Sequence, residues 1–119
     1  KRRLLVSSIG RAILAHLPAE TRDRLIATAP LERHTPETPT DRAAIARAVE
    51  EAALVGYALV RGEYVAGLAS LSTPVFDRQG AVVGATGLVF LDGRYDEAAI
   101  RDRLVPKLQA CATYLLSRL

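Results

Sequence analysis

The sequence predicts an α+β domain, in which an antiparallel β-sheet is flanked by helices. Apolar residues recur at spacings of three and four over residues 9–17 and 45–53 and again after residue 96, as in helices, whereas residues 57–90 follow the period of two that is typical of strands. The segment Asp77–Gly80 is rich in turn formers and indicates a hairpin between two strand-like stretches. Because half of the 119 residues are apolar, the chain fits one globular domain over residues 1–119.

Two helices and an extended connection are expected first. Ser7 and Ser8 are typical N-cap residues, and they precede an apolar stretch that predicts a helix over residues 9–17. Residues 19–27 predict a second, short helix. Three prolines between residues 30 and 40 exclude a regular helix there and indicate a surface connection.

Two longer helices are expected on either side of the strands. Thr40 is the predicted N-cap of one, Asp41 lies in its first turn, and Gly56 has the position of a C-terminal glycine. The last helix is expected over residues 96–119, with a kink at Pro106 or a proper start near Leu104. Its predicted buried stripe consists of Ile100, Leu104, Leu108, Cys111, Ala112, Leu115 and Leu119.

Three strands are predicted between these helices, over residues 57–60, 65–75 and 81–90. If Asp77 pairs with Gly80, the residues facing each other across the hairpin are Ser70 and Gly87, Ser72 and Ala85, and Leu68 and Val89. This face carries small or apolar side chains, which leaves room beside the sheet. Three strands are few, so we expect another chain or an N-terminal segment to cover the open edge.

Composition and charge argue against several classes of function. The net charge of +3 comes from charges that alternate in sign, and the basic residues 1–3 are interpreted as a solvated end, so a nucleic-acid surface on this chain is disfavoured. The sequence has no membrane-length apolar run, and we expect no membrane partner. A lone cysteine, Cys111, excludes a disulfide framework, so the cytoplasm is the expected location.

No arrangement of residues indicates catalysis, and we predict that the chain is not an enzyme. His16 is interpreted as a helix-terminal imidazole near free carbonyls, and His34 lies in the proline-rich connection without a motif partner. Cys111 lies in an apolar stripe, where a thiol normally packs without reacting. We expect no catalytic residue, no metal and no cofactor. An esterase-like alternative would require one of the histidines to lie within hydrogen-bond reach of a serine.

Three segments together resemble one family, the C-terminal effector-binding domain of the isocitrate lyase regulator (IclR) type transcription regulators. SSIGRAILAHLP resembles the family's opening helix, TAxGKAxLAxLP, and LERHTPETPTDRAAI resembles its Thr/Pro loop and the following helix. The most specific match is GYALVRGEYVAGLASLSTPVFDRQGAVVGATGLV, which resembles the hairpin pattern GYAxDxEExxxGxxCxAAPVFDxxGxVxAAxSVS. The resemblance implies a GAF- or profilin-like domain whose N-terminal strands are missing from this chain.

The resemblance also implies a ligand-binding site. In similar proteins a ligand carboxylate meets backbone amides at the start of the opening helix, here those of Ser8 and Ile9, although these serines could merely cap the helix. The family's aspartate falls on Val60, its cysteine on Ser70, and its two serines on Gly87 and Val89. The expected ligand-binding residues are Ser8, Ile9, Gly10, Val60, Leu68, Ser70, Gly87 and Val89.

The expected function is therefore ligand sensing in a transcription regulator. The loss of three polar groups favours a small organic acid that is relatively apolar. The resemblance implies that occupancy is passed to a winged helix-turn-helix domain, which is absent from this chain and through which alone DNA would be bound. The expected assembly is a homodimer or homotetramer. The alternative is an oligomerisation domain that has lost effector binding.

Overall fold

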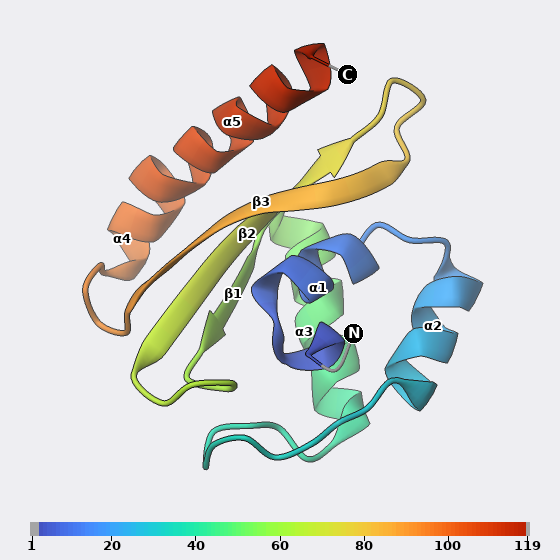
Figure 1. Cartoon of the computed structure of the whole chain (residues 1–119), viewed down its shortest axis with the longest axis vertical. Coiled ribbons are helices and arrows are strands. Elements are labelled where there is room, and N and C mark those ends of the chain that lie inside the picture. Colours follow the sequence, from blue (N-terminus) through green and yellow to red (C-terminus); the bar gives the residue numbers. More distant parts are fainter. Residues whose placement is uncertain (1–2, 119) are drawn as a thin grey trace.

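A three-stranded antiparallel sheet separates two layers of helices in the computed structural model, which describes residues 3–118 (Figure 1). The strands are β1 (Ala58–Arg61), β2 (Leu68–Phe76) and β3 (Val82–Leu91), with β2 in the centre. The helices α1 and α3 lie on one side of the sheet and α5 on the other. The predicted α+β class, with helices flanking an antiparallel sheet, is confirmed.

The helices are close to the predicted positions. They are α1 (Ser8–Leu14), α2 (Ala19–Thr28), α3 (Arg42–Val55), α4 (Glu97–Ala99) and α5 (Val105–Ser117). Within the described part of the chain, no helix combines the length and the apolar character needed to cross a membrane.

Local capping sets the ends of α1 and α3. The side chain of Ser7 accepts a hydrogen bond from the amide of Gly10, so Ser7 is the N-cap of α1. The expectation that Thr40 caps α3 was wrong, because Asp41 has extended backbone angles and its carboxylate accepts the Ala43 amide at 2.9 Å. Gly56 ends α3 with φ of +88°, as its position predicted.

The predicted hairpin register was wrong by two residues. The Gly80 amide donates to the Asp77 carbonyl, but the Asp77 amide donates to the carbonyl of Ala81, so Asp77 pairs with Ala81 and the turn is one residue longer than predicted. A bulge next to Phe76 then adds Val83 as an extra residue in β3. The observed pairs are Ser70 with Val89, Ser72 with Gly87, and Leu68 with Leu91. Because side chains alternate between faces, a shift of two keeps every predicted residue on its predicted face.

The buried stripe of the C-terminal helical segment also differs from the prediction. The segment Ile100–Leu104 forms a π-helical turn in which the Val105 amide bonds to the Ile100 carbonyl. The extra residue rotates the following helix, so Cys111 is exposed and does not pack in the core. The buried side chains are Ile100, Val105, Leu108 and Ala112, while Leu119 lies outside the described residues. Pro106 lies in the first turn of α5, where a proline is tolerated.

Two apolar clusters form the core, one on each face of the sheet. The first packs α1 and α3 together through Leu14, Ile45 and Val49. The second packs α5 against Leu71 of β2. Because Leu71 points toward α5, the adjacent Ser70 and Ser72 face α1. The α1 side of the central strand thus carries small polar groups where a core would carry large apolar ones.

The outer edge of β3 has no strand partner among residues 3–118. Val83, Val89 and Leu91 of this strand are exposed. The expectation that a further segment or another chain covers this edge stays a prediction.

Candidate ligand-binding site

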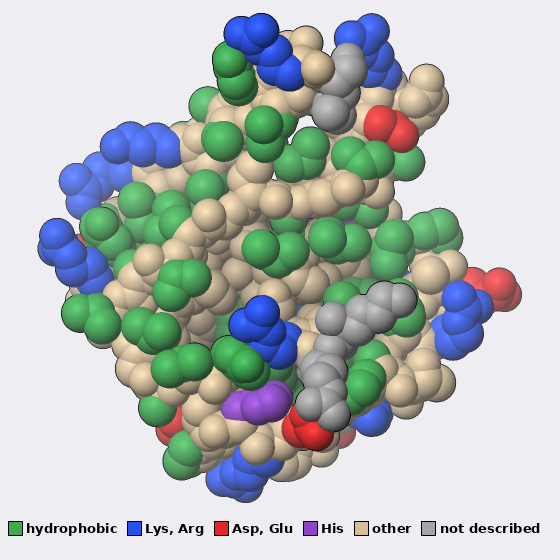
Figure 2. Space-filling model, in the orientation of Figure 1, with side chains coloured by type: hydrophobic (Ala, Val, Ile, Leu, Met, Phe, Trp, Pro, Cys, Tyr) green, Lys and Arg blue, Asp and Glu red, His purple; other side chains and the backbone are tan. Residues whose placement is uncertain are grey.

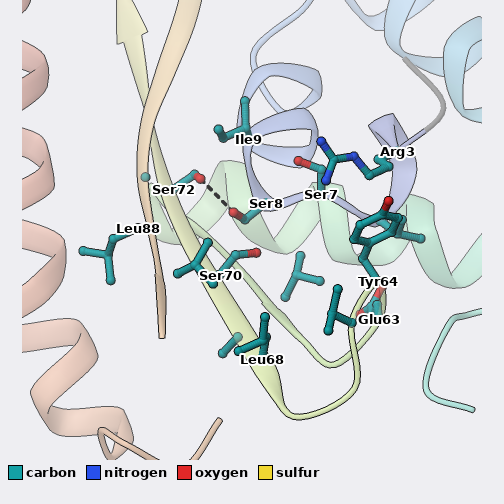
Figure 3. Close-up of a pocket in the computed structure, with 16 residues that line it drawn as sticks. Arg3, Ser7, Ser8, Ile9, Glu63, Tyr64, Leu68, Ser70, Ser72 and Leu88 are labelled. Atoms are coloured by element: carbon teal, nitrogen blue, oxygen red, sulfur yellow. Dashed lines mark hydrogen bonds between the residues drawn. The ribbon is translucent and has the colours of Figure 1, made fainter. Parts of the chain in front are cut away.

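A cavity of about 350 Å³ lies between the start of α1, the strands β2 and β3, and the loop that joins β1 to β2 (Figure 3). It is open to solvent, because Ile9 and Val89 on its wall are 47% and 66% exposed. The wall is mainly apolar, with a few hydroxyl and charged groups. This position and this lining are typical of a small-molecule site rather than of a packed core.

The cavity brings together all the predicted ligand-binding residues except one. The predicted residues on its wall are Ser8, Ile9, Val60, Leu68, Ser70, Gly87 and Val89. Gly10 is not on the wall. Its amide donates to Ser7, and a Cβ at this position would overlap the carbonyl oxygen of Leu4. Gly10 therefore allows the 3₁₀ turn of residues 4–6 to pack closely on α1.

Ser8 and Ser72 make the buried polar contact of the site. Their hydroxyl oxygens are 2.7 Å apart, and the two residues are 3% and 0% exposed. Gly87 lies opposite Ser72 in the sheet, and a Cβ there would overlap the Ser72 hydroxyl. The absence of that Cβ leaves the space in which Ser72 reaches across to α1. Ser7 caps the helix, while Ser8 uses its hydroxyl for this long-range contact, and binding of a ligand by the amides of Ser8 and Ile9 stays a prediction.

The β1–β2 loop forms a wall of the cavity that the sequence did not indicate. Glu63, Tyr64 and Val65 of this loop contribute to the lining. The carboxylate of Glu63 forms a two-point ion pair with the guanidinium of Arg11, which is 4% exposed. The Nε of Arg11 also donates to the Leu5 carbonyl at 2.8 Å. Arg11 thus attaches the loop to α1.

The Thr/Pro connection holds the same loop from the other side. The hydroxyl of Thr35 donates to the carbonyl of Gly62, and the hydroxyl of Thr38 donates to the carbonyl of Glu63. Both threonines are buried. Residues 65–67 were predicted to begin the second strand but lie in this loop, whose sequence signals are the match of Glu63 to the family's hairpin pattern and the flanking Gly62 and Gly67, both with positive φ. Such glycines predict a turn, but they do not say what the turn contacts.

Arg3 is a further cavity residue that sequence reasoning assigned elsewhere. It was expected to be part of a solvated basic end, of which Lys1 and Arg2 lie outside the described residues. Its guanidinium carbon is instead 4.6 Å from the centre of the Tyr64 ring, and it lines the cavity. On the face shown in Figure 2, the Lys and Arg side chains are scattered rather than gathered in one stripe, and hydrophobic side chains cover much of the middle.

The two histidines occupy aromatic contacts. The His16 ring lies 5.0 Å from that of Phe76 and the His34 ring 4.7 Å from that of Tyr64, both edge to face. Burial lowers the pKa of His16 below its ordinary value. Within residues 3–118, neither imidazole is hydrogen-bonded to a serine, and no group of three or more His, Cys, Asp or Glu side chains could hold a metal ion.

The fold and the match to a family model define the class of the chain as the C-terminal domain of a bacterial transcription regulator. Residues 1–116 match the model described as "Bacterial transcriptional regulator IclR C-terminal". The chain belongs to the IclR family.

Several known proteins are similar to this chain. The HTH-type transcriptional repressor AllR of Klebsiella pneumoniae is 36% identical over 85 residues, which are 71% of this chain and 31% of that protein. A double mutant of the inducer-binding domain of the Acinetobacter transcription factor PobR, in complex with 3-hydroxybenzoic acid, has a TM-score of 0.83 at 25% identity, covering 95% of this chain and 66% of that one.

An IclR homologue from Microbacterium sp. strain HM58-2 has a TM-score of 0.80 at 27% identity, covering 96% of this chain and 45% of that one. The chain spans between 31% and 39% of the length of the first curated relatives it matches. These relatives are named as transcription regulators, and none of the names denotes an enzyme.

Proposed function

We propose that this domain senses a small, largely apolar organic acid, which binds in the cavity between α1 and the sheet. The observation that carries the proposal is the cavity itself. Where β2 and β3 face α1, the positions Ser70, Ser72 and Gly87 are too small to fill the space. A double mutant of a related inducer-binding domain, that of PobR, has been solved with 3-hydroxybenzoic acid, and this similarity supports a carboxylate ligand here.

The proposed contacts divide into polar and apolar groups. Ser8 and Ser70 offer hydroxyls, and the family resemblance assigns the carboxylate to the backbone amides of Ser8 and Ile9. Val60, Leu68 and Val89 offer apolar surface to the rest of the ligand. Because Val60 and Val89 stand where the family pattern carries polar residues, the proposed ligand is less polar than a keto acid.

The proposed mechanism involves no chemistry on the ligand. An effector changes an equilibrium only through its different affinities for two states. The cavity is bounded by α1, by the sheet and by the β1–β2 loop, so an occupant touches three elements that could move relative to one another. In the proposal, occupancy shifts the arrangement of this domain and thereby of a separate DNA-binding domain.

A titration with carboxylates tests the proposal. Benzoate, phenylacetate and hexanoate would be added to the ¹⁵N-labelled chain, and amide shifts would be followed by NMR. We expect at least one acid to saturate and to shift amides of α1, β2 and the β1–β2 loop. Thermal melting gives an independent readout, since a ligand at 100 times its Kd adds about 2.7 kcal/mol of stability. Absence of saturable shifts around the cavity for every acid would refute the proposal.

An oligomerisation domain without effector binding is the second candidate. The edge of β3, which has no strand partner within the described residues, and its exposed Val83 and Leu91 favour it, because such an edge is a template for pairing with another chain. Melting temperatures that rise with protein concentration and do not respond to any acid would support this candidate. Homodimer and homotetramer remain the proposed assemblies, to be distinguished by sedimentation.

A further inference from the structure

The charged groups on the cavity wall are Arg3 and Glu63, and only Glu63 has an ion-pair partner among the described residues. Glu63 is neutralised by its two-point ion pair with the buried Arg11. Arg3 is exposed, and no carboxylate of residues 3–118 lies within ion-pair distance of it. The wall therefore presents one positive charge without a compensating negative one.

Arg3 is also held in place by an aromatic ring. Its guanidinium lies over Tyr64, as Figure 3 shows, at a distance of 4.6 Å from the ring centre. The Tyr64 ring is in turn contacted edge to face by His34. The loop that carries Tyr64 is anchored by hydrogen bonds from Thr35 and Thr38. A guanidinium ordered in this way loses less entropy when it binds an anion.

We propose that Arg3 selects for a carboxylate by pairing with it at the mouth of the cavity, and that Tyr64 positions the guanidinium. This inference rests on the proposed function and adds the group that distinguishes an acid from a neutral molecule of the same shape. Glu63 does not compensate the charge of Arg3, because its carboxylate is already paired with Arg11. In this proposal the carboxylate lies between the guanidinium of Arg3 and the amides of Ser8 and Ile9, all on the same cavity wall, and the apolar part of the ligand lies toward Leu68 and Val89.

Matched acid and amide pairs test the inference. Benzoate with benzamide, phenylacetate with phenylacetamide, and hexanoate with hexanamide differ in charge but hardly in shape. In the parent chain, the acid of the best-binding pair is expected to bind about tenfold more tightly than its amide, as for a hydrogen bond to a charged group. In Arg3→Gln, the affinity for the acid falls about tenfold while that for the amide stays within about twofold.

Arg94→Gln is the matched control. Arg94 stacks on Tyr95 at 5.3 Å, so this variant removes the same charge and the same kind of contact away from the cavity. Arg94→Gln should still bind the acid about tenfold more tightly than the amide. A preference that survives in Arg3→Gln overturns the inference. Equal binding of acid and amide to the parent chain also overturns it, while cavity binding stands. If neither molecule binds, the proposed function fails as well.

Two variants of Tyr64 test its positioning role. Tyr64→Phe retains the aromatic face and should retain the ratio of acid to amide affinity. Tyr64→Leu loses that face, and the ratio should fall severalfold without a matching loss of amide binding. If the two variants have the same ratio, Tyr64 has no positioning role.

Discussion

Ser72 and Gly87 face each other across β2 and β3, and the missing side chain of Gly87 leaves the Ser72 hydroxyl free to bond to Ser8 at 2.7 Å. This relationship joins the sheet to the first turn of α1. It also places two hydroxyl groups on a cavity wall that is otherwise mostly apolar. The pairing gives a physical reason for glycine at position 87, because any side chain there would meet the Ser72 hydroxyl.

Gly87→Ala should therefore destabilise the fold. The added Cβ would overlap the Ser72 hydroxyl and lie 2.8 Å from the Leu71 carbonyl oxygen, so strands and hydroxyl must shift. We expect a loss of about 1–3 kcal/mol in the free energy of unfolding, measured in urea. Gly84→Ala is the control on the same strand, because a Cβ there has no neighbour within 4 Å. Equal stability of the two variants would contradict the relationship.

Arg11 should be among the residues on which stability depends most. Arg11→Met leaves the Glu63 carboxylate without its partner in a largely buried position, and we expect a loss of about 3–5 kcal/mol in urea unfolding. The double variant Arg11→Met with Glu63→Leu should recover much of this loss, because no unpaired charge remains. Arg22→Met, which breaks the exposed pair with Asp23, should cost about 0.5 kcal/mol or less. A similar loss in both single variants would mean that the Arg11 pair is unimportant.

Val89→Asp should reduce acid binding. The new carboxylate lies on the cavity wall and repels an anionic ligand, so we expect affinity for the best carboxylate to fall by about tenfold or more in calorimetry. Val83→Asp introduces the same charge on the same strand at a position that is 55% exposed and does not line the cavity. It should bind as the parent chain does. Equal affinities of both variants would exclude the cavity as the binding site.

The stability of the domain should decrease as the pH falls through the titration of His16. Burial lowers the pKa of His16 in the folded chain below its ordinary value of 6.5, so the unfolded chain takes up the proton first. Unfolding is therefore favoured as the pH falls below about 6.5, and the effect levels off below the folded pKa. His16→Gln should remove this part of the profile, whereas His34→Gln, which leaves His16 in place, should keep it. A profile unchanged in His16→Gln would refute the assignment.

Short-range patterns were sufficient for much of the fold. The helix start at Ser7, the helix end at Gly56 and the alternation along β2 depend on neighbouring residues, because capping, positive φ and the period of two are local properties. The face of the sheet that lines the cavity was predicted correctly although the register was not. An error of two residues leaves each side chain on the same side.

The orientation of α5 was not predicted from the sequence. The π-helical turn before Val105 rotates α5, so Cys111 turns outward although its spacing predicted burial. The predicted stripe assumed a regular α-helix throughout, and the spacing of apolar residues does not reveal that one turn contains an extra residue.

The sequence by itself determined the fold class through periodicity and caps, and it determined the family through a specific hairpin motif, whose resemblance implied seven of the sixteen residues that line the cavity. Only the tertiary structure decided that Glu63 pairs with Arg11 and that Arg3 stacks on Tyr64. These partners are separated by about half the chain, and their contact depends on the packing of loops against α1. Local sequence patterns do not encode such packing.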